Sequence, residues 1–222
     1  MQIHPEDAPG RTGQGESAGP ADLARLLRWL RLSPGTPEAL EAAVVWSEAL
    51  ALARPATWRV EMHREDFLAR FHPFAQASLH LGRVLEGCPR VWLLAATIGP
   101  DLEERVAAYF AHDRPFAGYV LDRAGTLLVE RAMRGLIRQC GPGLTRRYSP
   151  GYKDFALEAQ RPLLEMVAQR PLLEMVAQRP LLGMPAQARR AEAAGPGLRL
   201  TDGCMLQPGK SITAVAGVRP AS

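Results

Sequence analysis

The chain is short of the residues that build metal centres and disulfide frameworks. Its three cysteines, Cys88, Cys140 and Cys204, are odd in number and far apart, so they form neither a CxxC metal pair nor a disulfide framework. We interpret them as reduced, buried thiols. The histidines from His63 to His80 stand eight or nine residues apart, unlike the i, i+4 pair of a helical metal site. No metal site is therefore predicted.

Long apolar runs and strong charge are missing as well. No apolar run approaches the roughly 20 residues of a membrane span. The N-terminus lacks the basic segment followed by an apolar one that marks a signal peptide. The net charge is only +4 and the basic residues are scattered, which argues against a nucleic-acid footprint. We therefore expect a cytoplasmic protein that binds neither membrane nor nucleic acid.

The composition sets the domain organisation. Of the 222 residues, 47% are hydrophobic, which is enough for one sizeable core. Residues 1–20 are rich in Gly, Pro, Ser and acidic residues and predict a disordered tail. We expect a single domain at residues 21–218, interrupted by a linker of small residues and arginines at 188–197.

Periodicity predicts a mixture of helices and strands. Thr36 followed by Pro37 is typical of a helix start, and Asp22 is a second candidate cap. Alternation of apolar and polar residues predicts a half-buried strand, and one continuous apolar run predicts a strand buried on both faces. Two further strands are expected to flank Gln207-Pro208-Gly209 as a hairpin. The helices are expected at 23–32, 37–53, from 101 onward and at 116–138, and the strands at 57–62, 91–98, 198–205 and 211–218.

A nine-residue unit is repeated in the last third of the chain. Residues 161–169 recur unchanged at 170–178, and again at 179–187 with Gly183 and Pro185 substituted. Nine residues advance a helix by half a turn, so successive copies would point their leucines in opposite directions, and one continuous amphipathic helix is excluded. We interpret the repeat as an in-frame duplication of which one copy packs natively; a partner-docking arm is the functional alternative.

The segment with the chemistry of a site is residues 147–154, Arg-Tyr-Ser-Pro-Gly-Tyr-Lys-Asp. Gly151 can take a positive φ and let a ligand approach the main chain, and Pro150 fixes its own φ. Arg147 carries a planar donor fork suited to a carboxylate. From physics alone, an ordinary turn with a surface arginine remains an alternative.

Two motifs in order carry a family resemblance. Arg147-Tyr-Ser-Pro-Gly-Tyr152 is followed by Leu-Glu-Ala-Gln at 157–160 and by Leu-Thr-Asp-Gly-Cys-Met-Leu-Gln-Pro-Gly-Lys-Ser-Ile-Thr-Ala-Val at 200–215. Together they resemble the activation domain of vitamin B12-dependent methionine synthase, in its small free-standing form. The resemblance implies an α+β fold with a twisted antiparallel sheet flanked by helices.

The resemblance also implies a ligand and partners. The domain binds S-adenosylmethionine, and its methyl group is presented to a cobalamin that a partner methionine synthase or other corrinoid methyltransferase holds; a flavodoxin-type protein donates one electron. By resemblance, Arg147 would hold the ligand carboxylate, main chain at Ser149 to Gly151 would hydrogen-bond the ligand, and Tyr152 would lie against the corrin. The chain has no Asp-x-His-x-x-Gly motif, so cobalamin is expected only through the partner.

Some positions depart from the family pattern. An acidic group is needed near the cationic amine and sulfonium, and Glu130 is the candidate, although on one register the acidic position falls at Thr126. Lys153 adds a cation beside a cationic ligand. The alternative function is a non-catalytic docking or scaffold protein that has lost ligand binding. Gly209-Lys210-Ser211 is not interpreted as a phosphate loop, because the glycine spacing and the following strand do not fit one.

Overall fold

The computed structural model describes residues 20–168 and 197–220. The predicted tail, except Pro20, lies outside these residues, as do the second and third repeat copies and nearly all of the predicted linker. Most expected elements are confirmed. The helices are α1 Pro20–Leu30, α2 Pro37–Leu52, α3 Arg64–Arg70, α4 His72–Ala77, α5 Leu79–Val84, α6 Asp101–Ala111, α7 Pro115–Gln139 and α8 Gln160–Ala168, with a short 3₁₀ turn at Leu157–Ala159. The strands are β1 Ala56–His63, β2 Arg90–Thr97, β3 Arg199–Leu200, β4 Leu206–Gln207 and β5 Ser211–Val218.

The two predicted helix caps have different outcomes. The Thr36 side chain accepts a hydrogen bond from the Ala39 N–H at 3.2 Å, and Pro37 opens α2, so this cap is confirmed. Asp22 is not the cap of the first helix, because α1 already begins at Pro20. Asp22 lies in the first turn of α1 and pairs with Arg131 of α7. Its carboxylate therefore joins two helices rather than ending one.

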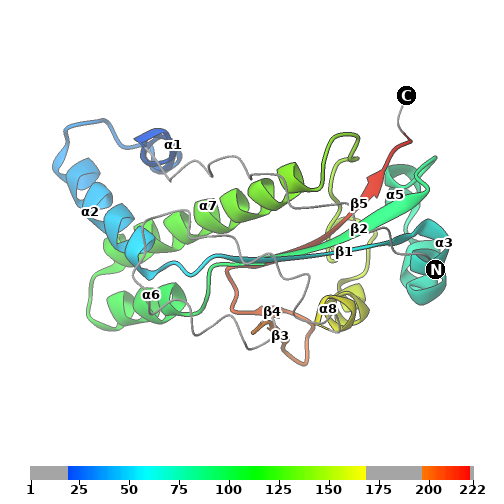
Figure 1. The fold of residues 1–222 in the computed structure, drawn as a ribbon. Coiled ribbons are helices and arrows are strands. Elements are labelled where there is room, and N and C mark those ends of the chain that lie inside the picture. Colours follow the sequence, from blue (N-terminus) through cyan, green and yellow to red (C-terminus); the bar gives the residue numbers. More distant parts are fainter. Residues whose placement is uncertain (1–19, 169–196, 221–222) are drawn as a thin grey trace, which may run out of the picture.

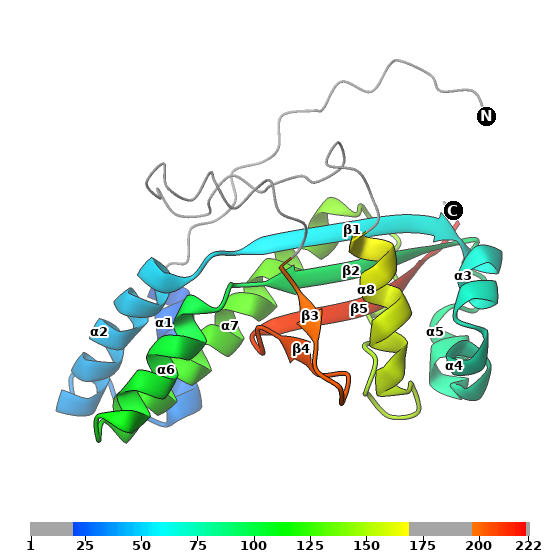
Figure 2. The same cartoon turned by 90° about the horizontal axis from the view of Figure 1, so that it is seen from below.

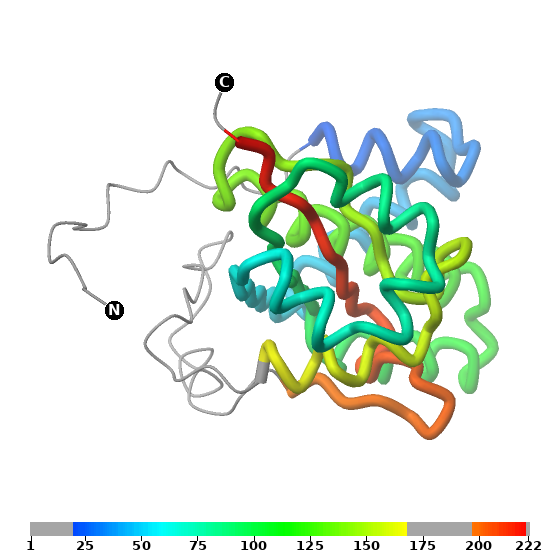
Figure 3. The backbone as a smooth tube through the Cα atoms, turned by 90° about the vertical axis from the view of Figure 1, so that its right-hand side faces the viewer, coloured from blue at the N-terminus to red at the C-terminus, as the bar shows by residue number. Residues whose placement is uncertain are grey.

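The centre of the fold is a three-stranded antiparallel sheet with the order β1-β2-β5. Helix α7 lies along one face of the sheet, whereas α8 and the β3-β4 pair lie on the other face (Figures 1 and 2). Helices α1, α2 and α6 gather around the start of α7, at the end of the sheet away from α3 to α5. Helices α3 to α5 gather at one end of the strands and lie nearest the viewer in Figure 3. The predicted fold class, an antiparallel sheet flanked by helices, is confirmed.

The middle strand separates two hydrophobic cores. Leu94 and Ala96 of β2 face the core under α7, whereas Leu93 and Ala95 face the core under α8 and α3 to α5, and all four side chains are fully buried. This alternation explains the continuous apolar run, because β2 has a neighbour on each side and a helical layer on each face. The prediction of a strand buried on both faces is confirmed.

The predicted C-terminal hairpin is wrong. Residues 198–205 do not form one strand: β3 ends at Leu200, and a tight turn containing Cys204 at φ +59° returns the chain into β4. Strand β5 pairs with β2 rather than with residues 198–205. The Thr201 N–H donates to the Met205 carbonyl at 2.9 Å, so a local turn satisfies backbone groups that were expected to pair in a strand.

Candidate functional site

The predicted site turn is tied to the sheet on one side. Tyr148 exchanges two backbone hydrogen bonds of 2.8 Å with Val215 of β5. The chain then reverses: the Gly151 N–H donates to the Phe155 carbonyl at 2.7 Å, and Gly151 has φ +81°. The positive φ of Gly151 therefore favours glycine, and a Cβ there, 2.9 Å from Leu157 Cδ1, would also make the end of that leucine side chain move.

Arg147 and Glu130, two of the predicted site residues, contact each other directly. Arg147 Nη2 donates to both carboxylate oxygens of Glu130, each at 2.8 Å. The side chains are 26% and 35% exposed. The second terminal nitrogen of Arg147, Nη1, is buried and has no hydrogen-bond partner among the described residues. The guanidinium is therefore held on one side by Glu130 and keeps an unused donor on the other.

Thr126, the other position considered for an acidic group, belongs to a different cluster. Its hydroxyl lies 3.1 Å from Lys210 Nζ, which also pairs with Asp122 at 2.7 Å. The backbone N–H of Lys210 donates to Glu103. The lysine of the Gly-Lys-Ser motif is thus paired with helix α7, and the motif leads into β5 rather than into a helix. Between the two positions, Glu130 is the one that lies beside Arg147.

Tyr152 and Lys153 form the exposed tip of the turn. The Tyr152 side chain is 53% exposed and packs edge-on against Tyr148, with ring centroids 5.8 Å apart. Lys153 has φ +52°, and its Nζ lies 5.9 Å from the centre of the Tyr152 ring. The turn therefore presents a large aromatic surface to solvent, with a cation beside it. Ser149 is half-buried, and its carbonyl accepts the Tyr152 N–H at 3.2 Å.

Asp154 connects the turn to α5, a role that sequence reasoning did not find. Its carboxylate accepts hydrogen bonds from the Ser78 hydroxyl at 2.7 Å, the Tyr148 hydroxyl at 2.9 Å and the His80 N–H at 3.1 Å. His80 Nδ1 is also 2.9 Å from it. Ser78 and His80 are 76 and 74 residues away in sequence, so only the position of Asp154 within the motif hinted at a role.

These contacts change the acidity of the cluster. Burial opposes ionisation of Asp154, but the hydrogen bonds from His80, Ser78 and Tyr148 outweigh it and hold the pKa of that carboxyl well below its usual range. The pKa of Tyr148 is raised, first by burial and then by its hydrogen bond to the Asp154 carboxylate. Asp154 therefore anchors the turn as a carboxylate, and Tyr148 donates to it as a neutral phenol.

Asp154→Asn should make the stability of the protein less dependent on pH in the acidic range. Because the pKa of Asp154 is depressed in the folded state, its contribution is fully present above the unfolded pKa of about 3.9 and is lost as the pH falls below that value. Melting temperatures at pH 7, 5 and 3.5 test this. The wild type should lose more on acidification than the variant, and equal losses would contradict the assignment. Asp202→Asn, on an exposed side chain, is the control.

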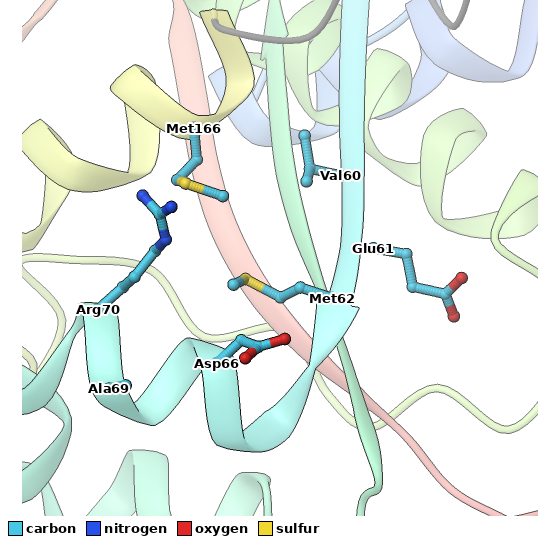
Figure 4. Close-up of a pocket in the computed structure, with 7 residues that line it drawn as sticks. All are labelled: Val60, Glu61, Met62, Asp66, Ala69, Arg70 and Met166. Atoms are coloured by element: carbon cyan, nitrogen blue, oxygen red, sulfur yellow. The ribbon is translucent and has the colours of Figure 1, made fainter. Parts of the chain in front are cut away.

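A hollow of about 520 Å³ lies apart from the predicted site residues. Its lining comes from β1, α3 and α8, and Figure 4 shows Met62, Arg70 and Met166 around it. Neither the turn nor Glu130 contributes to it. Sequence reasoning did not single it out, because Met166 of α8 reaches it from about 100 residues beyond the adjoining elements β1 and α3.

Other site types have little support. Among the described residues there is no group of three or more His, Cys, Asp or Glu side chains that could hold a metal ion. In the same part of the chain, no helix has the length and apolar character needed to cross a membrane. Cys88 and Cys204 are buried free thiols, as expected, whereas Cys140 is half-buried. Burial raises the pKa of the Cys88 thiol.

Comparison with known proteins gives likenesses in structure but none in sequence. No protein-family model matches the chain, and no curated protein matches it. The chain is similar to a solved structure described as the crystal structure of the MetH reactivation domain bound to AdoHcy, with 16% identity and a TM-score of 0.38. The match covers 60% of this chain and 40% of that one, so it spans well under half of the solved structure.

Proposed function

We propose that this chain binds S-adenosylmethionine at the Arg147 turn and presents its methyl group to cobalamin on a partner protein. It would act as an accessory component in the reductive reactivation of a cobalamin-dependent methionine synthase. The two ordered sequence motifs, at residues 147–152 and 200–215, support the family. The geometry around Arg147 supports S-adenosylmethionine as the ligand.

The unused donor of Arg147 is the observation that carries the proposal. A buried guanidinium N–H without a partner is costly, so such a group calls for an acceptor. The methionine moiety of S-adenosylmethionine carries an α-carboxylate next to an α-ammonium. Arg147 and Glu130 lie side by side with opposite charges and are therefore complementary to that zwitterion. The carboxylate would accept from Arg147 Nη1, and the ammonium would donate to Glu130.

The main chain of the turn can supply a further contact. The Gly151 N–H is already used by the Phe155 carbonyl, so it is not free for the ligand. The Ser149 carbonyl accepts only the Tyr152 N–H in this turn and has a second lone pair that could accept from the ligand. The exposed Tyr152 ring would then lie between the ligand and the corrin face of the partner.

The chemistry asks the protein mainly for positioning. The cobalamin of the partner, with one electron from a flavodoxin-type donor, would supply the chemistry that accepts the methyl group. The electron pair of the S–C bond would stay on sulfur, so the ligand would leave as the neutral thioether S-adenosylhomocysteine. This chain would hold the amino-acid end of the ligand and aim the methyl group outward.

Calorimetric titration with S-adenosylmethionine tests the proposal. Saturable binding of one ligand per chain is expected, with S-adenosylhomocysteine competing, since both share the amino-acid end that Arg147 and Glu130 would hold. Adenosine alone should bind far more weakly. Absence of saturable heat up to millimolar ligand would favour the alternative, a docking protein in which the Arg147–Glu130 pair is purely structural. A binder should then restore methylcobalamin spectra when mixed with a cob(II)alamin-loaded partner and reduced flavodoxin.

A further inference from the structure

Strand β1 has an outer edge that no described strand covers. It pairs with β2 along all eight of its residues, and β2 pairs with β5 on its other side. The outer edge of β5 is bridged by Leu144 and Tyr148, whereas no bridge to the outer edge of β1 occurs among residues 20–168 and 197–220. Strand β1 also contains no proline, lysine or bulge, the features that usually protect an edge. Its edge is therefore a template for one more strand.

Backbone hydrogen bonds show which residues of β1 face this free edge. In an antiparallel pair, alternate residues bond to the partner strand, and the residues between them direct their N–H and C=O groups the other way. Arg64, which directly follows β1, donates its N–H to the Pro89 carbonyl at 3.0 Å, in the register of the β1-β2 pairing. The even-numbered residues of β1 therefore bond to β2. The N–H and C=O groups of Arg59 and Glu61 point to the free edge.

The hollow of about 520 Å³ lies beside the same strand. Val60 and Met62 line it from β1, and Met166 of α8 completes an apolar surface (Figure 4). The Arg70 side chain of α3 extends toward Met166, and its guanidinium has no acidic partner in the described part of the chain. A strand added to β1 would place every second side chain on the face of the sheet that carries Val60 and Met62. The hollow can therefore receive side chains of such a strand.

We propose that the free edge of β1 binds an extended segment of a partner protein, with an apolar side chain in the hollow and one carboxylate at Arg70. Backbone hydrogen bonds to Arg59 and Glu61 would supply affinity, and the hollow would select the side chains. The exposed carboxylate of Asp66 also lines the hollow and would repel a second acidic side chain, so a polyacidic segment is disfavoured. This surface is independent of the ligand proposed for the Arg147 turn.

Amide hydrogen exchange of the full chain, followed by NMR, tests whether the edge is open. The Arg59 and Glu61 amides should exchange at least about tenfold faster than the Val60 amide, because only Val60 donates to β2. Equal protection of all three amides in the protein alone would mean that the edge is already covered, and the proposal would be wrong.

A synthetic peptide with the sequence Thr-Val-Thr-Leu-Thr-Glu-Thr, blocked at both ends and labelled with a fluorophore, tests the binding mode. Its apolar and acidic side chains lie on one face of an extended strand, and its threonines would lie opposite Arg59 and Glu61. Saturable binding measured by fluorescence polarisation is expected, together with slower exchange of the Arg59 and Glu61 amides. The same peptide N-methylated at its threonines should not bind, because it cannot donate to the edge.

Two pairs of variants separate the edge from the hollow. Glu61→Pro removes an N–H that faces the free edge but none that bonds to β2, so it should weaken peptide binding at least about tenfold. Glu61→Thr loses the same carboxylate, keeps the N–H and is the matched control. Arg70→Gln should weaken binding about two- to fivefold, the usual range for an exposed ion pair. Arg83→Gln, on the exposed surface of α5, should leave it unchanged.

Three results would overturn the proposal. Absence of saturable binding up to millimolar peptide would mean that the edge is not a docking site. Equal binding of the N-methylated peptide by the wild type, which needs no variant to fold, would show that backbone pairing is not used. Dimerisation of the protein alone, lost in Glu61→Pro but kept in Glu61→Thr, would assign the edge to a second copy of this chain instead.

Discussion

Arg147→Ala should weaken S-adenosylmethionine binding about 100-fold. The substitution removes the charge-assisted hydrogen bonds proposed for the ligand carboxylate, each worth about 1.5–3 kcal/mol, and about 1.4 kcal/mol corresponds to a factor of ten in affinity. It also leaves Glu130 without its partner at 2.8 Å, so the carboxylates of Glu130 and of the ligand repel each other. Calorimetric titration of wild type and variant under the same conditions gives the ratio directly.

Three controls make this result specific. Arg146→Ala removes the exposed neighbouring arginine and should leave the affinity within about twofold, because surface charges contribute little. Arg147→Lys keeps the charge but loses the planar fork, so an intermediate affinity is expected. Glu130→Gln should weaken the contact with the ligand amine but keep the Arg147 guanidinium that would hold the ligand carboxylate. If Arg147→Ala binds as tightly as wild type and melts normally, the turn is not the ligand site.

Gly217→Ala should destabilise the fold by about 1–3 kcal/mol, the usual cost of forcing an extra methyl group into a packed core. A Cβ on Gly217 of β5 would lie 2.6 Å from Cys88 Sγ and 3.2 Å from Leu85 Cδ2. Cys88 and Leu85 are both almost fully buried, so they cannot easily move aside. Thermal melting should show a decrease of about 2–10 °C.

The same substitution at Gly82 should have the opposite sign. Gly82 is exposed in the interior of α5, and a Cβ there would meet nothing within 4 Å. Replacing a helical glycine by alanine typically adds about 0.5–1 kcal/mol of stability. Cys88→Ala should partly rescue Gly217→Ala, because it removes the sulfur that the new methyl group strikes. Equal effects at Gly82 and Gly217 would mean that packing at β5 is looser than the structure indicates.

Local sequence patterns predicted helices and strands well where the pattern and the structure it forms lie within one element. The cap at Thr36 and the apolar run in β2 each depend on side chains within one element, and both are confirmed. Prediction failed for residues 198–205, which were expected to form a strand beside Gln207-Pro208-Gly209 but contain a turn at Cys204 instead. A Pro-Gly pair marks a turn in the chain but does not say which strands pair on either side of it.

The candidate site likewise combines residues that a local motif predicts with contacts that only the fold creates. Arg147, Ser149, Gly151 and Tyr152 stand together in one motif, and their ligand role stays a proposal. Glu130 was chosen from its place on the helix before the turn, and the fold brings it to Arg147. The contacts of Asp154 with residues of α5 could not be foreseen, because nothing in the intervening chain sets their distance.

The sequence by itself determined the longer helices α1, α2, α6 and α7, the central strand, the glycine-dependent turn and the duplication of the α8 segment, but not the short helices α3 to α5. Tertiary structure alone decided which strands are neighbours, which carboxylate lies beside Arg147 and which residues donate hydrogen bonds to Asp154. The physical reason is range: caps, periodicity and backbone dihedral angles act over a few residues, whereas strand order and side-chain pairing depend on how distant elements bury their apolar faces together.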